Sequence, residues 1–435
     1  MNKQHNFKST SVFMGFIFGV LLTVTITVVG KTSTGSIPLK EISAFTDVFE
    51  KVKSDYVEEI SDKDLMEHAI EGLLAGLDPH SAYLSPDDLQ ELQESTSGKF
   101  GGLGIQVSME DGFVKVVAPI DDTPAYEAGI QSGDIFIRLD DKPVKGMTLS
   151  DAVDIMRGEP GTSIVLTVVR DGTAKPFKVK ITRAIIKTKS VKSKVLDDKY
   201  GYIRISQFQV NTTYDLKQAI TKLKKDTDNK MAGIIIDLRN NPGGVLRGAI
   251  GVSNTFISKG VVVSTKGREK TANKTYNASG SDILSGKPIV VLVNEGSASA
   301  SEIVAGALQD HRRAVIVGTQ TFGKGSVQSI HELSNGGAIK LTTARYFTPN
   351  GTSIQNEGIV PDIEVDKLKI SSVEKSIDPL KEADLEKHIS NPNKKISKKI
   401  KQEKSAKKSK DDKKDNDDYQ LNTALNILKG LSITR

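Results

Sequence analysis

Apolar positions along the chain change their spacing several times, and each spacing predicts a different element. Residues 11–30 carry no charge and are rich in Val, Phe, Leu and Ile. A helix of about twenty residues, rising about 1.5 Å per residue, spans a ~30 Å hydrocarbon core. Residues 28–32 offer no clear small-residue cleavage site, which favours an uncut anchor over a cleaved signal peptide. A short basic end, 1–10, is then cytoplasmic, and the body lies outside the cytoplasm at the cell membrane.

Helical spacing follows in an N-terminal segment at 37–96. Apolar residues recur every three or four positions over 42–56 and 64–77, and a third helix is expected over 86–96. Asp62 stands where the second of these helices needs an N-cap. The region is therefore predicted to be a helical N-terminal segment, with a turn at 77–81 after its second helix.

Strand-like alternation marks a small, mainly-β region at 97–185. One helix is expected at 149–156, after Thr148. Alternating strands are expected at 105–109, 113–118, 135–139, 164–169 and 177–181. The opening Gly102, Leu103, Gly104 and Ile105 would let backbone N–H groups converge on a carboxylate beside a strand edge that a peptide can join. An ordinary glycine-rich turn fits this loop equally well, but the complete set of elements resembles a PDZ domain.

Strands alternating with helices predict an α/β core at 190–370. The expected strands are 201–205, 232–237, 261–264, 288–293 and 314–317, and the expected helices are 213–224, 245–256 and 302–310. Two further strands, 338–343 and 346–347, are expected after the core's last helix. Residues 371–418 are polar, lysine-rich and without periodicity, which predicts a disordered linker. Helical spacing returns at 419–435, so a final helix is expected to dock back on the body.

Composition narrows the function classes. Cysteine is absent, which excludes disulfides, a thiol nucleophile and cysteine metal sites. The net charge is +6, but residues 394–414 hold eleven lysines and three acidic residues, so the remainder is slightly negative. Nucleic-acid binding is therefore not expected. We favour a solvated linker for this run, with an electrostatic tether to anionic membrane or wall polymers as the alternative.

A serine cluster at 297–301 carries the first candidate chemistry. Ser299 and Glu302 have capping-box spacing, so Ser299 could simply cap the helix that follows. A serine at a helix N-terminus is also suited to acyl transfer, because the next N–H and the helix dipole stabilise an oxyanion. Such a nucleophile needs a base.

Lys324 is the strongest candidate for that base. It lies between two glycines directly after an expected buried strand, and burial lowers a lysine pKa toward neutrality. The ordinary interpretation of such a lysine is a solvated side chain. Among the six histidines, only His80 and His331 remain as weak candidates.

A competing motif ends at the same lysine. Residues 318–324 match a P-loop, but Gly325 replaces the Ser or Thr that would hold Mg²⁺. The chain that follows reads as extended, whereas a P-loop requires a helix. A nucleotide site is therefore not expected.

Ordered motifs carry a resemblance to a family. The chain resembles the C-terminal processing peptidases, which are tail-specific serine endopeptidases, over roughly 42–366 and the final helix. The motifs are 77–81 (LDPHS), the PDZ segment, 237–244 (DLRNNPGG), 296–302 (GSASASE) and 321–328 (TFGKGSVQ). The resemblance implies an α/β core of the crotonase/Clp-like kind with an inserted PDZ domain.

The resemblance also implies roles for single residues. Ser299 matches the nucleophile, Lys324 the general base and Gln328 the residue that orients the lysine. Gly244 and Ala300 match the oxyanion-hole donors, and Ser301 is then free to cap the helix. No metal or organic cofactor is required, and dimers through terminal helical segments are frequent in the family, so a homodimer is expected here.

These expectations combine into one function. The chain is predicted to be a membrane-anchored, extracytoplasmic serine endopeptidase whose substrates are proteins or peptides with exposed C-termini. Its PDZ domain would bind the substrate C-terminus and gate the site. A catalytically inactive PDZ scaffold and a Ser–His hydrolase are the alternatives.

Overall fold

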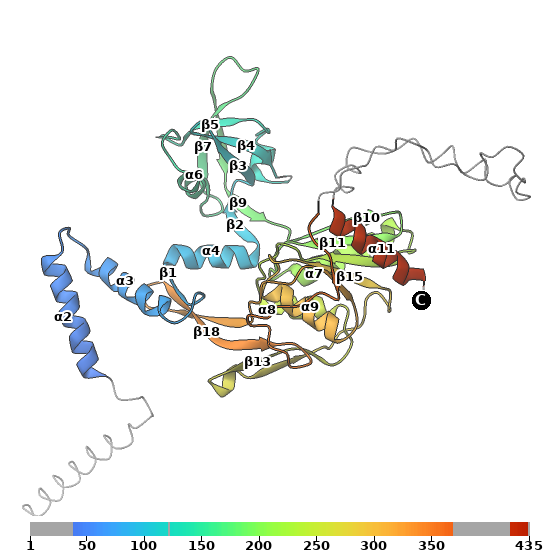
Figure 1. Cartoon of the computed structure of the whole chain (residues 1–435). Helices are drawn as coiled ribbons and strands as arrows, with labels where there is room; N and C mark the ends of the chain where they lie inside the picture. The colour runs from blue at the N-terminus through green and yellow to red at the C-terminus, as the bar shows by residue number, and fades with distance from the viewer. Residues whose placement is uncertain (1–37, 121, 369–417, 434–435) are drawn as a thin grey trace, which may run out of the picture. The chain divides into compact units, whose positions relative to one another are not determined.

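The structure is a computed structural model that describes residues 38–120, 122–368 and 418–433 (Figure 1). The predicted anchor at 11–30 and nearly all of the linker at 371–418 lie outside these ranges, so both stay predictions. None of the helices within the described ranges combines the length and the apolar character needed to cross a membrane. The chain divides into two compact units, one up to Gly76 and one from Leu77 onward.

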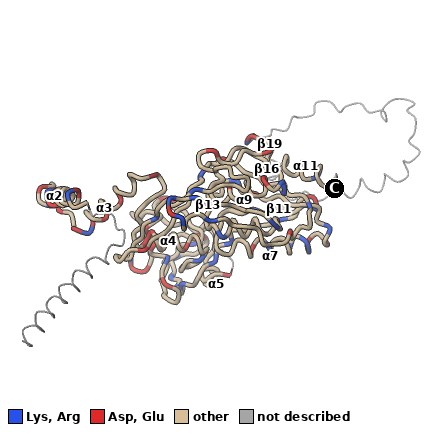
Figure 2. Tube along the Cα trace, turned by 90° about the horizontal axis from the view of Figure 1, so that it is seen from below, with Lys and Arg blue, Asp and Glu red and all other residues tan. Residues whose placement is uncertain are grey.

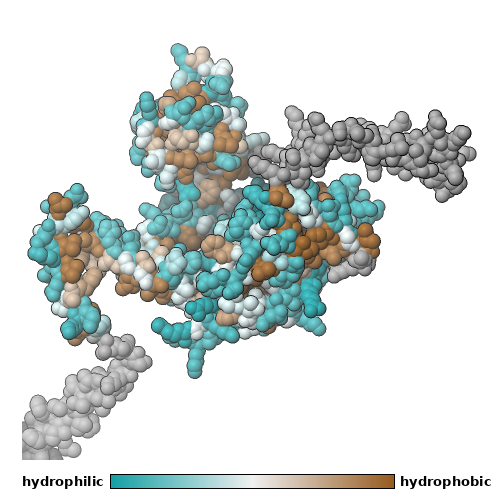
Figure 3. Space-filling view, in the orientation of Figure 1, coloured by the Kyte–Doolittle hydropathy of each residue, from teal (hydrophilic) through white to brown (hydrophobic). Residues whose placement is uncertain are grey.

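The first unit contains helices α2 (Leu39–Asp55) and α3 (Asp62–Ala75). The expected N-cap at Asp62 is wrong. Ser61 has extended dihedrals (φ −70°, ψ 149°) and its hydroxyl accepts the N–H of Asp64 at 3.1 Å, so Asp62 is the first helical residue. Helix α2 buries none of its residues and presents an exposed apolar stripe, seen as brown patches in Figure 3, formed by Leu39, Ile42, Phe45, Val48 and Val52.

The PDZ region is an antiparallel sheet with helix α6 (Leu149–Met156) beside it. Its order is β3 (Ile105–Glu110), β4 (Phe113–Pro119), β5 (Ile135–Leu139), β7 (Ser163–Val169) and β8 (Phe177–Thr182), with the short β6 (Lys142–Pro143) paired to β5. The five expected strands are confirmed with shifts of one residue at most at either end. Thr148 caps α6 in a capping box with Asp151, which explains why the start of this helix could be predicted.

Two short strands carry the chain into and out of the PDZ region. Helix α4 (Pro86–Ser97) leads into β2 (Lys99–Gly102), which pairs antiparallel with β9 (Ala184–Lys187). A short helix, α5 (Pro124–Glu127), follows β4 within the PDZ region.

The α/β core is built on a six-stranded sheet. Its order is β10 (Val191–Leu196), β11 (Tyr200–Ile205), β12 (Gly233–Asp237), β15 (Ile289–Val293), β16 (Val315–Gly318) and β19 (Ile363–Glu364). All neighbours pair in parallel except β10 with β11. Every residue of β12 and β15 is buried, as expected for central parallel strands covered on both faces.

Different helices cover the two faces of this sheet. Alternate strand residues, Ile234 and Val291 among them, pack with α7 (Thr212–Asp226), α8 (Leu246–Asn254) and α9 (Ala300–Asp310). The residues between them, such as Ile235 and Val290, pack with the C-terminal helix α11 (Tyr419–Ile433). Figure 1 shows α11 lying across this end of the core, so the expected docking of a final helix is confirmed.

A second sheet flanks the core. It has the order β1 (Ala82–Leu84), β18 (Ala338–Phe347), β13 (Val261–Gly267) and β14 (Lys274–Asn277), and β17 (Ser326–Glu332) also pairs with β18. The expectation of two separate strands at 338–343 and 346–347 is wrong. The intervening Ala344 and Arg345 pair with both β13 and β17, which keeps β18 continuous.

Positively and negatively charged residues are distributed over the whole described chain. Figure 2 shows Lys and Arg interspersed with Asp and Glu.

Candidate active site

The serine cluster lies in a sharp turn between β15 and α9. Ser299 has φ 54° and ψ −110°, a conformation that costs a non-glycine residue about 1–3 kcal/mol. Contacts from the preceding turn hold it there. The Ser297 hydroxyl donates to the carbonyl of Leu238 at 2.8 Å, and the N–H of Ala298 donates to the carbonyl of Asn241 at 3.0 Å. The expected capping role of Ser301 is wrong, because its buried hydroxyl donates to the same Asn241 carbonyl at 2.9 Å.

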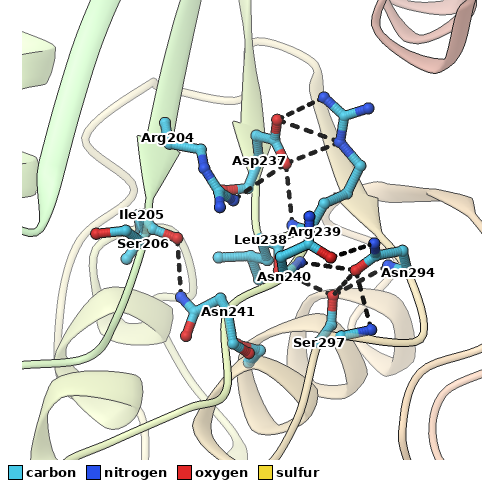
Figure 4. Close-up of polar contacts among 12 residues, drawn as sticks. Arg204, Ile205, Ser206, Asp237, Leu238, Arg239, Asn240, Asn241, Asn294 and Ser297 are labelled. Atoms are coloured by element: carbon cyan, nitrogen blue, oxygen red, sulfur yellow. Dashed lines mark hydrogen bonds and ion pairs between the residues drawn. The ribbon is translucent and has the colours of Figure 1, made fainter. Parts of the chain in front are cut away.

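The loop after β12 packs directly against the serine turn. The fully buried Asn241 donates its side-chain amide to the carbonyl of Ile205 and accepts the N–H of Gly243 (Figure 4). Gly243 has φ 103°, and a Cβ placed there would lie 2.8 Å from the Cβ of Ser299. Only glycine allows this approach.

Gly244 and Ala300 sit on these two loops. Gly244 has φ 135°, and a Cβ there would lie 2.1 Å from the carbonyl oxygen of Phe208. Within the described ranges, no hydrogen-bond acceptor meets the N–H of Gly244 or of Ala300. Both groups therefore remain available to a ligand, as oxyanion donors must be.

Lys324 follows β16 and is half-buried. Burial lowers the pKa of its amine from the ordinary value, and the positive charge of Lys340 lowers that pKa further, while Asp78 and Glu302 oppose the shift. The interpretation of Lys324 as a fully solvated lysine is therefore wrong. The strand β17 follows where a P-loop would need a helix, so the structure also contradicts a P-loop here.

A buried carboxylate joins the serine turn to the lysine loop. Glu302 is completely buried and accepts four hydrogen bonds. Its Oε2 accepts the N–H of Ser299 at 2.7 Å and the N–H of Lys324 at 2.9 Å. Its Oε1 accepts the N–H of Gly323 at 2.7 Å and the hydroxyl of Thr321 at 2.6 Å. One side chain thus fixes the backbones of the predicted nucleophile and the predicted base.

The sequence pattern predicts only one of the contacts of Glu302. Capping-box spacing explains its bond to Ser299 but says nothing of the lysine loop, 22 residues away in sequence. Burial raises the pKa of Glu302, and the four hydrogen bonds act against that rise. The continuous run of apolar and small residues after it, which buries α9 on all sides through Leu308, is the signal that could have indicated its burial.

Gln328 lies on β17, close to the lysine loop in sequence. Its side-chain amide donates to the hydroxyls of Ser326 at 3.0 Å and Thr342 at 3.2 Å. Within the described chain, no hydrogen bond joins Gln328 to Lys324. Its orienting role therefore stays a prediction.

The LDPHS motif reaches the same network from the start of the second unit. Asp78 accepts the Thr342 hydroxyl at 3.1 Å and the N–H groups of His80 and Ser81. His80 thus belongs to a local turn, and both burial and the charge of Lys324 lower the pKa of its imidazole. His331, the other histidine candidate, is exposed on β17.

The PDZ candidates share one groove. Gly102, Leu103, Gly104 and Ile105 line a cavity of about 160 Å³ with Val153, Met156 and other residues. Strand β3 is at the edge of its sheet. The structure thus places an unpaired strand edge, a glycine-rich loop and an apolar helix face together, as addition of a peptide strand requires.

A larger cavity of about 840 Å³ lies along the second sheet and reaches the start of α8. Its lining includes Leu246, at the start of α8, and Val327, beside Gln328. Tyr276 and Leu341 contribute apolar surface to its wall.

Across residues 38–120, 122–368 and 418–433, no three His, Asp or Glu side chains are grouped as a metal site would need.

Comparisons with known proteins cover nearly the whole chain. Family models match for peptidase family S41 over 199–365, for a PDZ domain over 101–181 and for the N-terminal domain of the activating protease CtpB over 24–88. A carboxy-terminal-processing protease of Bartonella bacilliformis is 46% identical over 419 residues, 95% of each chain. A probable CtpA-like serine protease of Staphylococcus aureus is 36% identical over 375 residues, 83% of this chain and 74% of that protein. The solved photosystem II D1 C-terminal processing protease is 32% identical, with a TM-score of 0.44, over 74% of this chain and 86% of that one.

Proposed function

Because this chain belongs to the carboxy-terminal-processing serine proteases of peptidase family S41, we propose that it cleaves proteins by a Ser299–Lys324 acyl-enzyme mechanism. The observation that carries the proposal is that both residues donate their backbone N–H groups to one buried carboxylate, that of Glu302. Glu302 holds the N–H of Ser299 and the N–H of Lys324 on a single oxygen. The backbones of the proposed nucleophile and base are thereby held close together, and the proposed dyad uses no histidine.

The chemistry follows from this placement. The neutral amine of Lys324 takes the proton from the Ser299 hydroxyl as its oxygen attacks the scissile carbonyl carbon. The N–H groups of Gly244 and Ala300 stabilise the resulting oxyanion. The intermediate collapses, the C–N bond breaks and the lysine ammonium returns its proton to the leaving amine. Water, deprotonated by the same lysine, then attacks the acyl ester and releases the acid and Ser299.

Gln328 would act through its neighbours. It donates to Ser326 and Thr342, and Thr342 donates in turn to Asp78. To orient the lysine, the Gln328 side chain would have to turn its carbonyl oxygen toward the amine of Lys324. The PDZ groove supports recognition of a substrate C-terminus, with β3 accepting the peptide as an added strand. Occupancy of that groove would gate the site.

Membrane attachment and self-association complete the proposal. The uncharged stretch at 11–30 supports a single-pass anchor with the catalytic region outside the cytoplasm. The exposed apolar stripe of α2 supports a homodimer. Alkaline carbonate extraction of membranes tests the anchor, because an anchored chain stays in the pellet. Light scattering of the wild type and of Phe45→Glu tests the dimer, which this charge should dissociate.

Cleavage of a peptide with an apolar C-terminal tail tests the catalytic assignment. Wild type should cleave it, whereas Ser299→Ala and Lys324→Ala should not. Full activity in both variants would overturn the assignment. Binding of the peptide by the wild type without cleavage would support an inactive PDZ scaffold. Loss of turnover in His80→Ala or His331→Ala, with Lys324→Ala active, would support a Ser–His hydrolase.

A further inference from the structure

The C-terminal helix α11 is joined to the catalytic loops by one arginine. Arg239 follows β12, two residues after its last residue, and its guanidinium is largely buried, with 15% of the side chain exposed. It donates Nε and Nη2 to the carboxylate of Asp237. It also donates two hydrogen bonds to the carboxylate of Asp418, just before α11, from Nη1 at 2.9 Å and from Nη2 at 2.8 Å.

Gln420 completes the shell of this guanidinium. Its Oε1 accepts Nη1 of Arg239 at 3.0 Å, and its own amide donates to the carbonyl of Val365 at 2.7 Å. A guanidinium has five N–H donors, and each of them has an acceptor here. Three of those acceptor contacts come from Asp418 and Gln420, so most of the hydrogen bonding of Arg239 depends on α11 being docked.

Arg239 is followed directly by the loop that reaches the serine turn. Asn240 has φ 50°, donates its N–H to Oδ1 of Asn294 at 2.7 Å and accepts the Asn294 amide at 2.8 Å (Figure 4). Asn294 in turn receives the N–H of Gly296 and donates its own N–H to the Ser297 hydroxyl. A continuous set of contacts therefore runs from α11 through Arg239 to the turn that carries Ser299.

Apolar packing keeps α11 in place on the far face of the same strands. Leu421, Ala424 and Leu428 are buried against Ile235, Val290 and other strand residues. The packing is close, because a Cβ added at Gly233 would lie 2.8 Å from a methyl group of Leu428. One surface ion pair, Lys429 with Asp197, holds the distal part of the helix without touching Arg239.

We propose that Asp418 and Gln420 are positioning residues of the active site, which hold Arg239 and thereby the loop that presents Gly243 and Gly244 beside Ser299. The proposal rests on the function proposed above. An arginine with only Asp237 left would no longer be tied to a second element, and the loop that follows would sample other positions. The oxyanion donor would then be misplaced, whereas the PDZ groove and the substrate-binding surface would be unchanged.

Asp418→Asn in the full chain tests this proposal. Each preparation is normalised to active sites by titration with a fluorophosphonate, so that loss of folded protein does not enter kcat. The kcat should fall about 10- to 100-fold with KM nearly constant, less than the ~100- to 1,000-fold of removing an oxyanion donor outright. The rate at which the fluorophosphonate phosphonylates Ser299, with loss of fluoride, should fall in parallel. Asp418→Glu should restore part of the loss, and Gln420→Ala should give a smaller loss of the same kind.

Lys429→Met is the matched control, because it removes an α11 contact that does not involve Arg239. It should leave kcat within about twofold of wild type. Equal effects of Asp418→Asn and Lys429→Met, or a loss confined to KM, would overturn the proposal. An inactive Ser299→Ala with a fully active Asp418→Asn would overturn this inference alone. An active Ser299→Ala would instead overturn the proposed function.

Discussion

Glu302→Gln isolates the role of the buried carboxylate with almost no change in volume. The carboxylate accepts from four donors, and an amide replaces one of its two oxygens with an NH₂ group. The amide oxygen should turn toward Ser299 and Lys324, because both of those partners are N–H groups. The NH₂ then faces the Thr321 hydroxyl and the N–H of Gly323. Among the described residues, that N–H has no acceptor other than Glu302.

The expected losses of stability and of kcat in Glu302→Gln follow from these contacts. One orphaned buried N–H costs about 1–3 kcal/mol. The two surviving bonds lose their ionic character, and a hydrogen bond to a charged group contributes roughly 1 kcal/mol more than a neutral one. The free energy of unfolding should therefore fall by about 3–5 kcal/mol. Displacement of Ser299 or Lys324 by about 1 Å should lower kcat by about 100-fold.

The pH dependence of kcat/KM separates this role from general destabilisation. The negative charge of Glu302 raises the pKa of Lys324, so its removal lowers that pKa and should move the activity limb to lower pH. The assay is peptide cleavage normalised by active-site titration, together with urea unfolding of each variant. A Glu302→Gln protein with wild-type kcat and an unmoved limb would refute the reasoning.

Thr321→Val is the matched control for this experiment. It removes the hydroxyl that donates to Oε1 of Glu302 and that accepts the N–H of Ile359 at 2.7 Å. Its stability loss should be similar, since it also orphans a buried N–H. The carboxylate still holds Ser299 and Lys324, so kcat should stay within about tenfold of wild type.

Three further predictions concern other parts of the chain. The activity of the wild type should rise with pH as Lys324 loses its proton, at a pH below the ordinary lysine pKa of 10.5. Lys340→Gln removes a neighbouring positive charge, so it should raise the pKa of Lys324 and move this rise in activity to higher pH. A rise at the same pH as in the wild type would contradict this prediction. Gly243→Ala should abolish peptide cleavage, because the added Cβ would lie 2.8 Å from the Cβ of Ser299. The control is Gly351→Ala, where φ is 84° and no atom lies within 4 Å of the added Cβ. It should lower stability by only about 1–2 kcal/mol and leave activity unchanged. Val153→Glu should weaken binding of an apolar-tailed peptide to the PDZ groove by about tenfold in a fluorescence titration, and unchanged affinity would exclude that groove as the binding site.

Local patterns accounted for the elements whose contacts are local. Helix α6 begins where the pattern put it, because Thr148 and Asp151 close a capping box three residues apart. Strands β12 and β15 were visible as apolar runs because both of their faces are buried. The same local logic found Ser299 at a helix start and Lys324 between glycines.

Long-range contacts decided what the pattern could not express. The strand β18 was predicted as two pieces, because Arg345 is a charged residue whose place in the strand is set by its partners in β13 and β17. Asp78 meets Thr342 across 264 residues, and Arg239 meets Asp418 across 179. No periodicity records such a pair.

The sequence by itself determined the order of elements, the two sheets' apolar strands and the residue types able to attack and to take a proton. Only the tertiary structure decided that Glu302 is buried where four donors converge and that Lys324 is desolvated beside Lys340. The physical reason is that a carboxylate or an amine acquires its pKa and its partners from surroundings that many distant segments supply together. Hydrophobic periodicity is read from neighbours along the chain, whereas the electrostatics of a site depends on neighbours in space.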